Sequence, residues 1–271
     1  MNKYLDNFYD WWKNIDKFLL FLILSLFLLG LFFSLVSTSL IASEKLDTKS
    51  YYFFFKHLAY IALAIMILII FSFLNQKFLT KFSLILFVVA FLSLLLVPFL
   101  GIEVKGSKRW LDLLFLPRFQ PVEIVKPFFI VTLSLMLTIQ NRRLYFKYFL
   151  SIFLILPILI LLVYQPDIGQ TLLLAMVWLS LIFISGINVY IFFVFFLLVG
   201  SILSYLVLFV TKFEYIKIRL LAFLDSSSGN NYQAEKASDA IINGGFFGKG
   251  IGEGTLNSRV PEAHTDYIVS V

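Results

Sequence analysis

Residues 18–41 read FLLFLILSLFLLGLFFSLVSTSLI and carry no charged side chain. A helix needs about 20 apolar residues to cross the hydrocarbon core of a bilayer, so this stretch is long enough to span it. Lipid offers the backbone no hydrogen-bond partners, which makes helices the expected form and the fold class all-α. Further apolar runs follow, and the sequence predicts a polytopic membrane protein with seven spans: Phe18–Ile41, Leu58–Leu74, Phe82–Leu100, Val125–Ile139, Phe149–Tyr164, Thr171–Ile187 and Val189–Val210.

The composition of the chain excludes an ordinary soluble protein. Of 271 residues, 61% are hydrophobic and 14% charged, whereas soluble domains average about 45–50% and about 25%. The absence of cysteine excludes zinc sites built on cysteine, iron–sulfur ligation and thiol catalysis. The net charge of +6 comes from cations that interrupt apolar runs, so anionic membrane lipid is the expected partner and nucleic acid is not.

Charges between the spans favour a cytoplasmic N-terminus. The short loops on that side are rich in cations, which are Lys77 and Lys81 in one loop and Arg142, Arg143 and Lys147 in another. Most of the other loop cations lie in two long loops, to which the positive-inside rule applies less well. We interpret residues 1–271 as one transmembrane domain in which residues 211–265 form a large extracytoplasmic loop. Tyr267–Val271 starts an eighth apolar run too short to span, so we expect further C-terminal spans beyond this sequence.

Five cations lie between Lys105 and Lys126, next to the start of the fourth span. Pro121 suits the first turn of a helix, and Glu123 would complement the positive end of the helix dipole there. Lys126 follows three residues later and therefore lies on the same helix face as Glu123. This pattern predicts either a salt-bridged helix start or a cationic pocket for a phosphate-bearing lipid headgroup.

Residues 165–169, Gln-Pro-Asp-Ile-Gly, lie between the fifth and sixth spans. Asp167 could cap the sixth helix, with Pro166 closing the turn before it. Capping does not explain Gln165, which must find a partner at membrane depth. The connection at residues 186–188 is so short that it predicts a tight turn between the sixth and seventh spans.

The long loop contains a short helix and a glycine run. Residues 231–242 could form an amphipathic helix that ends at Asn243 and Gly244. Residues 244–254 hold Lys249 among many glycines. No Ser or Thr follows the Gly-Lys pair and no strand precedes it, so the run is interpreted as a loose loop and not as a phosphate-binding P-loop.

The same loop ends in Pro-Glu-Ala-His-Thr-Asp, residues 261–266, directly before apolar residues. Partial desolvation at the bilayer edge raises the proton affinity of a carboxylate, which suits Asp266 to the role of general base. The alternative is a helix N-cap formed by Thr265 or Asp266. His264 is one of only two histidines, so the sequence predicts no histidine-based metal site.

The order of these motifs resembles the SEDS family (shape, elongation, division and sporulation), which includes FtsW, RodA and SpoVE. The motifs are Lys108-Arg-Trp110, Phe119–Glu123 with Lys126, Gln165–Gly169, the glycine run and Pro261–Asp266. The resemblance covers essentially the whole chain and is greatest to the FtsW cell-division branch. Three positions depart from the family pattern without touching Glu123, Lys126 or Asp266: Val122 replaces a common serine, Ser107-Lys108 a common Ala-Arg, and Tyr267–Ser270 a common Phe-Ile-Phe-Ala.

The resemblance implies an inverting glycosyltransferase of the bacterial plasma membrane that polymerises lipid II into peptidoglycan strands at the division septum. Such a protein has about ten helical spans. Asp266 matches the family's catalytic aspartate and would deprotonate the acceptor hydroxyl. Lys126, Arg118 and Arg109 would stabilise the leaving pyrophosphate, Glu123 would hold Lys126, and Trp110 would pack on the sugar or the lipid edge. The remaining candidate substrate-binding residues are Gln165, Asp167, Lys249 and His264.

The residues show no dedicated cofactor site, although a divalent cation such as Mg or Mn could share the stabilisation of the pyrophosphate. The resemblance implies a class B penicillin-binding transpeptidase and other division proteins as partners. Two other functions stay open, a lipid II flippase and a scaffold that recruits division proteins. Replacing Asp266 with Asn should abolish polymerisation by an enzyme and spare the other two functions.

Overall fold

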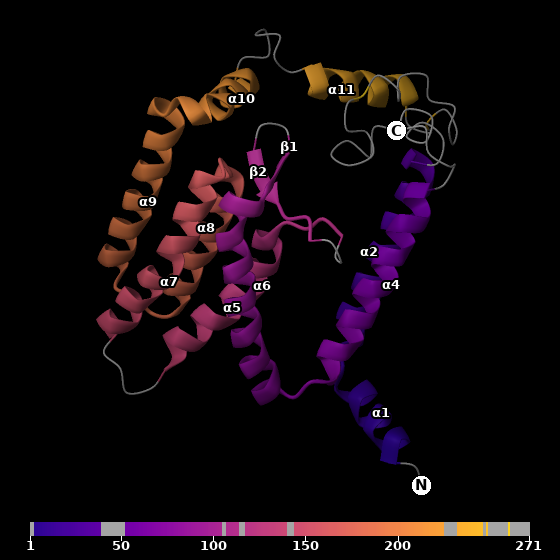
Figure 1. Cartoon of the computed structure of the whole chain (residues 1–271). Coiled ribbons are helices and arrows are strands. Elements are labelled where there is room, and N and C mark those ends of the chain that lie inside the picture. Colours follow the sequence, from indigo (N-terminus) through magenta and orange to yellow (C-terminus); the bar gives the residue numbers. More distant parts are fainter. Residues whose placement is uncertain are drawn as a thin grey trace. The chain divides into compact units, whose positions relative to one another are not determined.

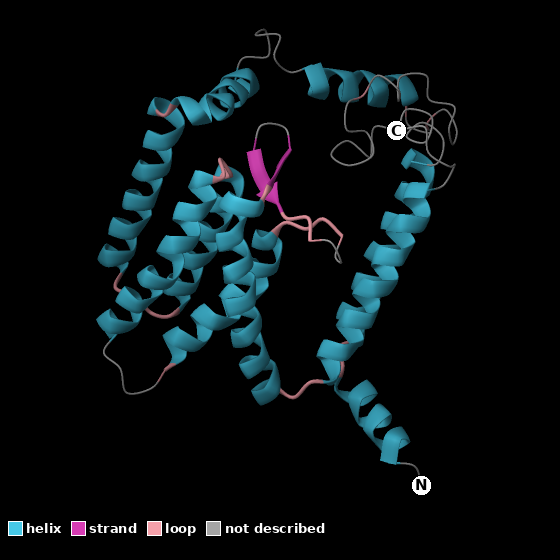
Figure 2. Ribbon diagram, viewed as in Figure 1, coloured by secondary structure: helices cyan, strands magenta, loops and turns pink. Residues whose placement is uncertain are grey.

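The computed structural model describes residues 3–38, 52–104, 107–113, 117–139, 144–224, 232–245, 248 and 260 (Figure 1). Helices dominate the described chain, as the all-α prediction requires, and a single two-stranded hairpin interrupts them within these ranges (Figure 2). The chain groups into two compact units, residues 1–74 with 221–271 and residues 75–220, which are described separately.

The first unit contains α1 (Lys3–Asn14), α2 (Lys17–Thr38), α4 (Tyr52–Phe73) and α11 (Tyr232–Gly244). The long apolar helices α2 and α4 pack against each other. The Trp11 indole ring stacks on Phe73 with 4.6 Å between the ring centroids, and its Nε1 donates a hydrogen bond to Ser72 Oγ at 2.9 Å. These contacts fix the short helix α1 at the end of α4.

The second unit is a bundle with a small hairpin. It comprises α5 (Gln76–Leu100), β1 (Ile102–Val104), β2 (Ser107–Trp110), α6 (Pro121–Thr138), α7 (Leu144–Tyr164), α8 (Ile168–Ile184), α9 (Val189–Phe209) and η1 (Thr211–Phe213). The following helix, α10 (Glu214–Leu224), passes from this unit into the other.

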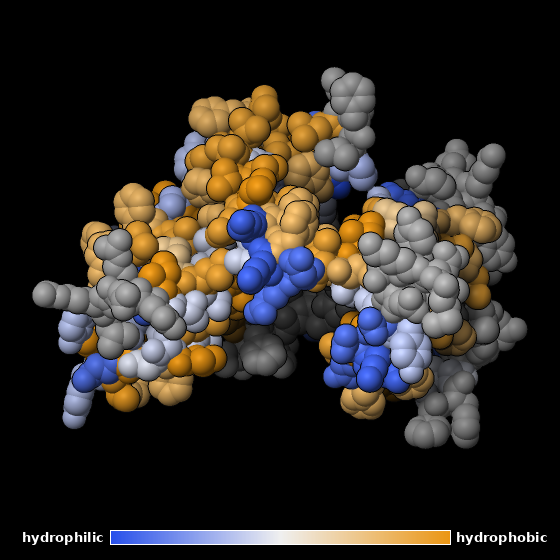
Figure 3. All heavy atoms as spheres, turned by 90° about the horizontal axis from the view of Figure 1, so that it is seen from below, coloured by the Kyte–Doolittle hydropathy of each residue, from blue (hydrophilic) through white to orange (hydrophobic). Residues whose placement is uncertain are grey.

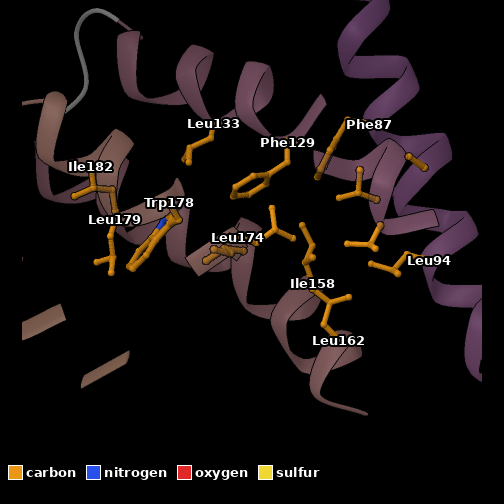
Figure 4. Close-up of a cluster of buried hydrophobic side chains, with 14 of the residues drawn as sticks. Phe87, Leu94, Phe129, Leu133, Ile158, Leu162, Leu174, Trp178, Leu179 and Ile182 are labelled. Carbon is orange, nitrogen blue, oxygen red and sulfur yellow. The ribbon is translucent and has the colours of Figure 1, made fainter. Parts of the chain in front are cut away.

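The core of the bundle lies around α6. Its buried residues recur every three or four positions, and Phe129 and Leu133 lie among Phe87 of α5, Ile158 of α7 and Leu174 of α8 (Figure 4). Helices in lipid gain little from the hydrophobic effect, so interlocking packing of this kind and polar contacts hold such a bundle together. The bundle therefore presents a fixed frame for the polar residues at the start of α6 and α8.

All seven predicted spans are helices, but the apolar runs placed some helix starts too late. α4, α5 and α7 begin five or six residues earlier than predicted, because the helices continue through polar and charged residues that flank the apolar runs. Within the described ranges, six helices are long and apolar enough to cross a membrane, and α8, with 17 residues, is shorter. Apolar side chains cover much of the surface seen in Figure 3, as lipid contact requires.

The predicted turns are confirmed. Gly186 has φ of +85°, and the Asn188 side chain accepts a hydrogen bond from the Tyr190 backbone N–H at 2.9 Å, which makes the tight turn between α8 and α9. The helix predicted at residues 231–242 is α11, and it ends at Gly244, before Gly245 with φ of +66°. The β1–β2 hairpin was not predicted, because strands of three and four residues with an irregular register leave no clear alternation in the sequence.

Candidate substrate-binding site

Two helix starts lie side by side in the second unit and carry the main polar contact between α6 and α8. Lys126 Nζ forms an ion pair with Glu123 Oε2 at 2.7 Å, as their spacing on α6 predicts. Gln170 of α8 donates a hydrogen bond from Nε2 to Glu123 Oε1 at 2.9 Å. We call these three residues the α6–α8 bridge. It connects positions 47 residues apart and leaves Glu123 half-exposed.

Asp167 forms a second network at the start of α8. Its side chain is 8% exposed and accepts hydrogen bonds from the Gln170 backbone N–H at 3.4 Å and from Gln120 Nε2 at 3.0 Å. Arg109 of β2 places its Nε 3.6 Å from the same carboxylate. The predicted helix cap is confirmed, and the carboxylate also links the hairpin and the segment before α6 to α8.

Arg109 makes further contacts that hold the turn between α7 and α8. Its Nε donates to the backbone carbonyl of Gln165 at 3.4 Å, and its Nη2 donates to the carbonyl of Pro166. A guanidinium can serve several acceptors at once because its donors form a rigid fork. The structure thus assigns Arg109 a structural role, and its predicted contact with substrate phosphate stays a prediction.

Gln165 is buried, with its side-chain Nε2 lacking a hydrogen-bond partner among the described residues. The sequence required a partner for this side chain. In the described contacts, the backbone of Gln165 is bonded instead: its N–H donates to the Leu161 carbonyl and its carbonyl accepts from Arg109. Gln165 lines a pocket of about 250 Å³ together with Lys108 of β2 and Lys212 of η1. Lys212 is held there, since its Nζ donates to the Tyr164 carbonyl at 2.7 Å.

Other candidates lie apart from these networks or outside the described residues. Arg118 Nε pairs with Asp112 Oδ2 at 2.9 Å, and both side chains are exposed. Trp110 lies on β2 opposite Ile102 and is partly exposed. Neither residue has a contact with the α6–α8 bridge among those that the structure describes. Lys249, His264 and Asp266 fall outside the described residues, so their placement stays a prediction.

Two network residues were missed by the sequence reasoning. Gln170 lies three residues after the helix-capping Asp167, a spacing like that of a capping box, which could have drawn attention to it. Gln120 lies at the N-cap position of α6, although it makes no capping hydrogen bond there. Its bond to Asp167 joins residues 47 apart and leaves no local signal in the sequence.

The α6–α8 bridge can receive an anion. An ammonium group has three N–H donors, and the described contacts of Lys126 occupy one of them, with Glu123. The partner carboxylate lowers the cost of keeping the cation at the edge of apolar helices. Among the described residues, no group of three or more His, Asp or Glu side chains could hold a metal ion.

The sequence matches the FtsW/RodA/SpoVE family, described as "Cell cycle protein", over residues 17–271. A relative from Caulobacter vibrioides named "Probable peptidoglycan glycosyltransferase FtsW" is 30% identical, and the alignment covers 96% of this chain and 66% of the relative. A protein of the same name from Coxiella burnetii is 32% identical, and the alignment covers 95% of this chain and 70% of that relative. The chain thus spans about two thirds of the length of these relatives.

Solved structures share the fold. A chain of a peptidoglycan synthase complex, described as coordinating polymerization and crosslinking, superposes with a TM-score of 0.63 and 23% identity over 88% of this chain and 67% of that one. The rod shape determining protein RodA of Thermus thermophilus gives a TM-score of 0.58 and 23% identity, and the alignment covers 70% of this chain and 60% of RodA. At this level of sequence identity, the structural similarity supports a shared fold and nothing more.

Proposed function

This chain belongs to the FtsW/RodA/SpoVE family, and from that premise we propose that it is a peptidoglycan glycosyltransferase that polymerises lipid II during cell division. The observation that carries the proposal is the α6–α8 bridge, which places a cation, with two N–H donors that no described contact uses, at the start of α6, an apolar helix of membrane length, and beside the shorter apolar helix α8. A lipid-linked pyrophosphate has the complementary parts, an anionic group and an apolar chain. Relatives named as probable peptidoglycan glycosyltransferases support the reaction class.

The proposed reaction is a single inverting displacement. The 4-hydroxyl oxygen of the acceptor sugar attacks the anomeric carbon of the donor, the bond to the pyrophosphate oxygen breaks, and the acceptor proton passes to Asp266. A positioned general base contributes about 10²–10⁴-fold. Negative charge grows on the departing pyrophosphate, and in this proposal Lys126, which is held by Glu123, stabilises it.

Glu123 and Gln170 act on this step through Lys126. Glu123 holds the ammonium group by the 2.7 Å ion pair, and Gln170 holds Glu123 by a hydrogen bond from α8. A side chain held in place before reaction avoids reorganisation when charge develops. A divalent cation would add to the stabilisation of the pyrophosphate.

The setting of the reaction follows from the family. The chain is a multi-pass membrane protein, and our proposal places it in the bacterial plasma membrane at the division septum with a cytoplasmic N-terminus. The proposed partner is a class B penicillin-binding transpeptidase. Support comes from the structural likeness to a chain of a synthase complex described as coordinating polymerization and crosslinking.

The test is lipid II polymerisation by the full-length protein together with its transpeptidase, with wild type compared against Asp266→Asn. We expect long glycan products from wild type and none from the variant. Asp239→Asn is a matched control, since Asp239 is an exposed residue of α11 paired only with Lys236 among the described contacts, and it should retain activity. Equal polymerisation by wild type and Asp266→Asn contradicts the catalytic role. Absence of product from wild type favours the flippase or scaffold alternatives.

A further inference from the structure

A shallow groove runs along the outer surface of the bundle between α6 and α8. It has a volume of about 630 Å³, and its walls include Ile130 of α6 and Leu173, Met176 and Val177 of α8. Leu173 and Met176 are each nearly half-exposed, although they belong to a bundle that buries their neighbours Leu174 and Ala175. The groove is therefore an apolar surface that the described part of the chain leaves uncovered.

The groove lies within one helical turn of the α6–α8 bridge. Ile130 lies one helical turn after Lys126 on α6, and Leu173 lies one turn after Gln170 on α8, so each bridge residue shares a helix face with a groove residue. Gly169 lines the groove at this end. A Cβ at Gly169 would meet one atom within 4 Å, Asp167 Oδ1 at 4.0 Å, apart from its chain neighbours, so the described structure leaves space directly beside this glycine.

From this continuity we propose that the groove holds the polyprenyl tail of the lipid-linked substrate while the bridge binds its pyrophosphate. The inference rests on the proposed function and adds the site of the tail. An amphiphile with an anionic head complements the pair of surfaces. Lys126, with two N–H donors that no described contact uses, lies at one end, and the lining of the groove is almost entirely apolar. An entirely apolar transmembrane helix of a partner protein would match the apolar wall but would offer no anion to Lys126.

Anchoring the tail here has a consequence for catalysis. Binding energy from a part of the substrate that does not react can hold the reacting part in position. The tail and pyrophosphate would then be fixed by one pair of helices, α6 and α8, which the core packs rigidly together (Figure 4). The sugar beyond the pyrophosphate would be left free to meet the acceptor.

The experiment uses site-specific photocrosslinking in the full-length protein. Leu173 is replaced by the photoreactive amino acid p-benzoylphenylalanine, and Leu198 of α9 is replaced in the same way as a control. The two positions are matched, because Leu173 is 47% and Leu198 52% exposed on apolar helices, and only Leu173 lines the groove. The probes are radiolabelled undecaprenyl pyrophosphate and, as ordinary lipid, radiolabelled phosphatidylglycerol.

We expect undecaprenyl pyrophosphate to label position 173 about tenfold more than position 198, a preference of about 1.4 kcal/mol. Phosphatidylglycerol should label both positions equally. Lys126→Gln should lower labelling at position 173 by about tenfold, since it removes a charged donor from the headgroup. Two results would overturn the proposal. One is equal labelling of the two positions by undecaprenyl pyrophosphate, and the other is labelling at position 173 that Lys126→Gln leaves unchanged.

A second substitution keeps the test independent of the photoreactive residue. Leu173→Trp should fill part of the groove and raise the KM for lipid II, whereas Leu198→Trp should leave it unchanged. The failures of the two proposals are distinguishable. Polymerisation without selective labelling at position 173 overturns the tail site alone, and selective labelling without polymerisation supports the tail site while contradicting the proposed activity.

Discussion

Replacing Asp167 with Ala tests the network that joins the hairpin, the segment before α6 and α8. The carboxylate accepts from Gln120 at 3.0 Å and from the Gln170 N–H at 3.4 Å, and it lies 3.6 Å from Arg109 Nε. Alanine removes all three contacts and creates little strain, because it is smaller than aspartate. The variant should therefore report the loss of the network itself.

The size of the effect follows from the three contacts. Loss of a helix cap costs about 1 kcal/mol, and leaving the amide of Gln120 without its acceptor costs about 1–3 kcal/mol. Arg109 is 29% exposed and keeps its two carbonyl acceptors, so losing its ion pair adds about 1 kcal/mol or less. The total is about 3 kcal/mol, which lowers the Tm of a chain of this size by about 6–12 °C.

Thermal unfolding in detergent, followed by tryptophan fluorescence, measures this change. The Gln170 N–H and Gln120 Nε2 bond to different oxygens of Asp167, and Asp167→Asn keeps one of these two acceptors, so its Tm should fall by less than that of the alanine variant. Asp112→Ala removes an exposed ion pair with Arg118 and should shift the Tm by only about 1–2 °C. An unchanged Tm for Asp167→Ala, or equal losses for the Ala and Asn variants, would refute the reasoning.

Two other predictions concern a turn and the bridge. Gly186→Ala should destabilise the protein by about 1–2 kcal/mol because Gly186 has φ of +85°. Gly200→Ala in α9 should stabilise it by up to about 1 kcal/mol, because a Cβ at Gly200 would meet no described atom within 4 Å. If both variants change the stability in the same direction in the unfolding assay, the backbone explanation is contradicted. Lys126→Gln should reduce the kcat of lipid II polymerisation by about 10²–10³-fold. Glu123→Gln should reduce the kcat by less, because the ammonium group of Lys126 remains. A larger loss of kcat for Glu123→Gln would contradict the roles assigned to the two residues.

The sequence predicts the helices of this chain well because a membrane span requires a long stretch of apolar residues, which is visible in the sequence. Apolar runs mark the seven described helices between α2 and α9, although Lys126 lies within the run of α6. The run before Leu58 is broken by Lys56 and His57, yet α4 starts at Tyr52, since a helix end near the interface tolerates polar side chains. Helix ends are thus set by backbone hydrogen bonding, which hydropathy does not record.

The site was predicted where its contacts are local. The spacing of Glu123 and Lys126 on one helix face gave their ion pair, and the position of Asp167 before a span gave its cap. The bonds of Gln120 to Asp167 and of Gln170 to Glu123 depend on how α6 packs against α8, and a single sequence holds no record of that packing.

The structure separates two kinds of cation that the sequence treats alike. Arg109 uses its forked donors on Asp167 and two backbone carbonyls, so it fixes the fold beside the site. Among the described contacts, Lys126 meets one carboxylate, which leaves two of its N–H donors for a ligand. Lys108, where the family commonly has arginine, is exposed on β2 while Arg109 is half-buried, as alternation along a strand requires. Exchange of lysine and arginine at position 108 therefore leaves the Asp167 network intact, whereas the same exchange at Arg109 would remove the fork that holds it.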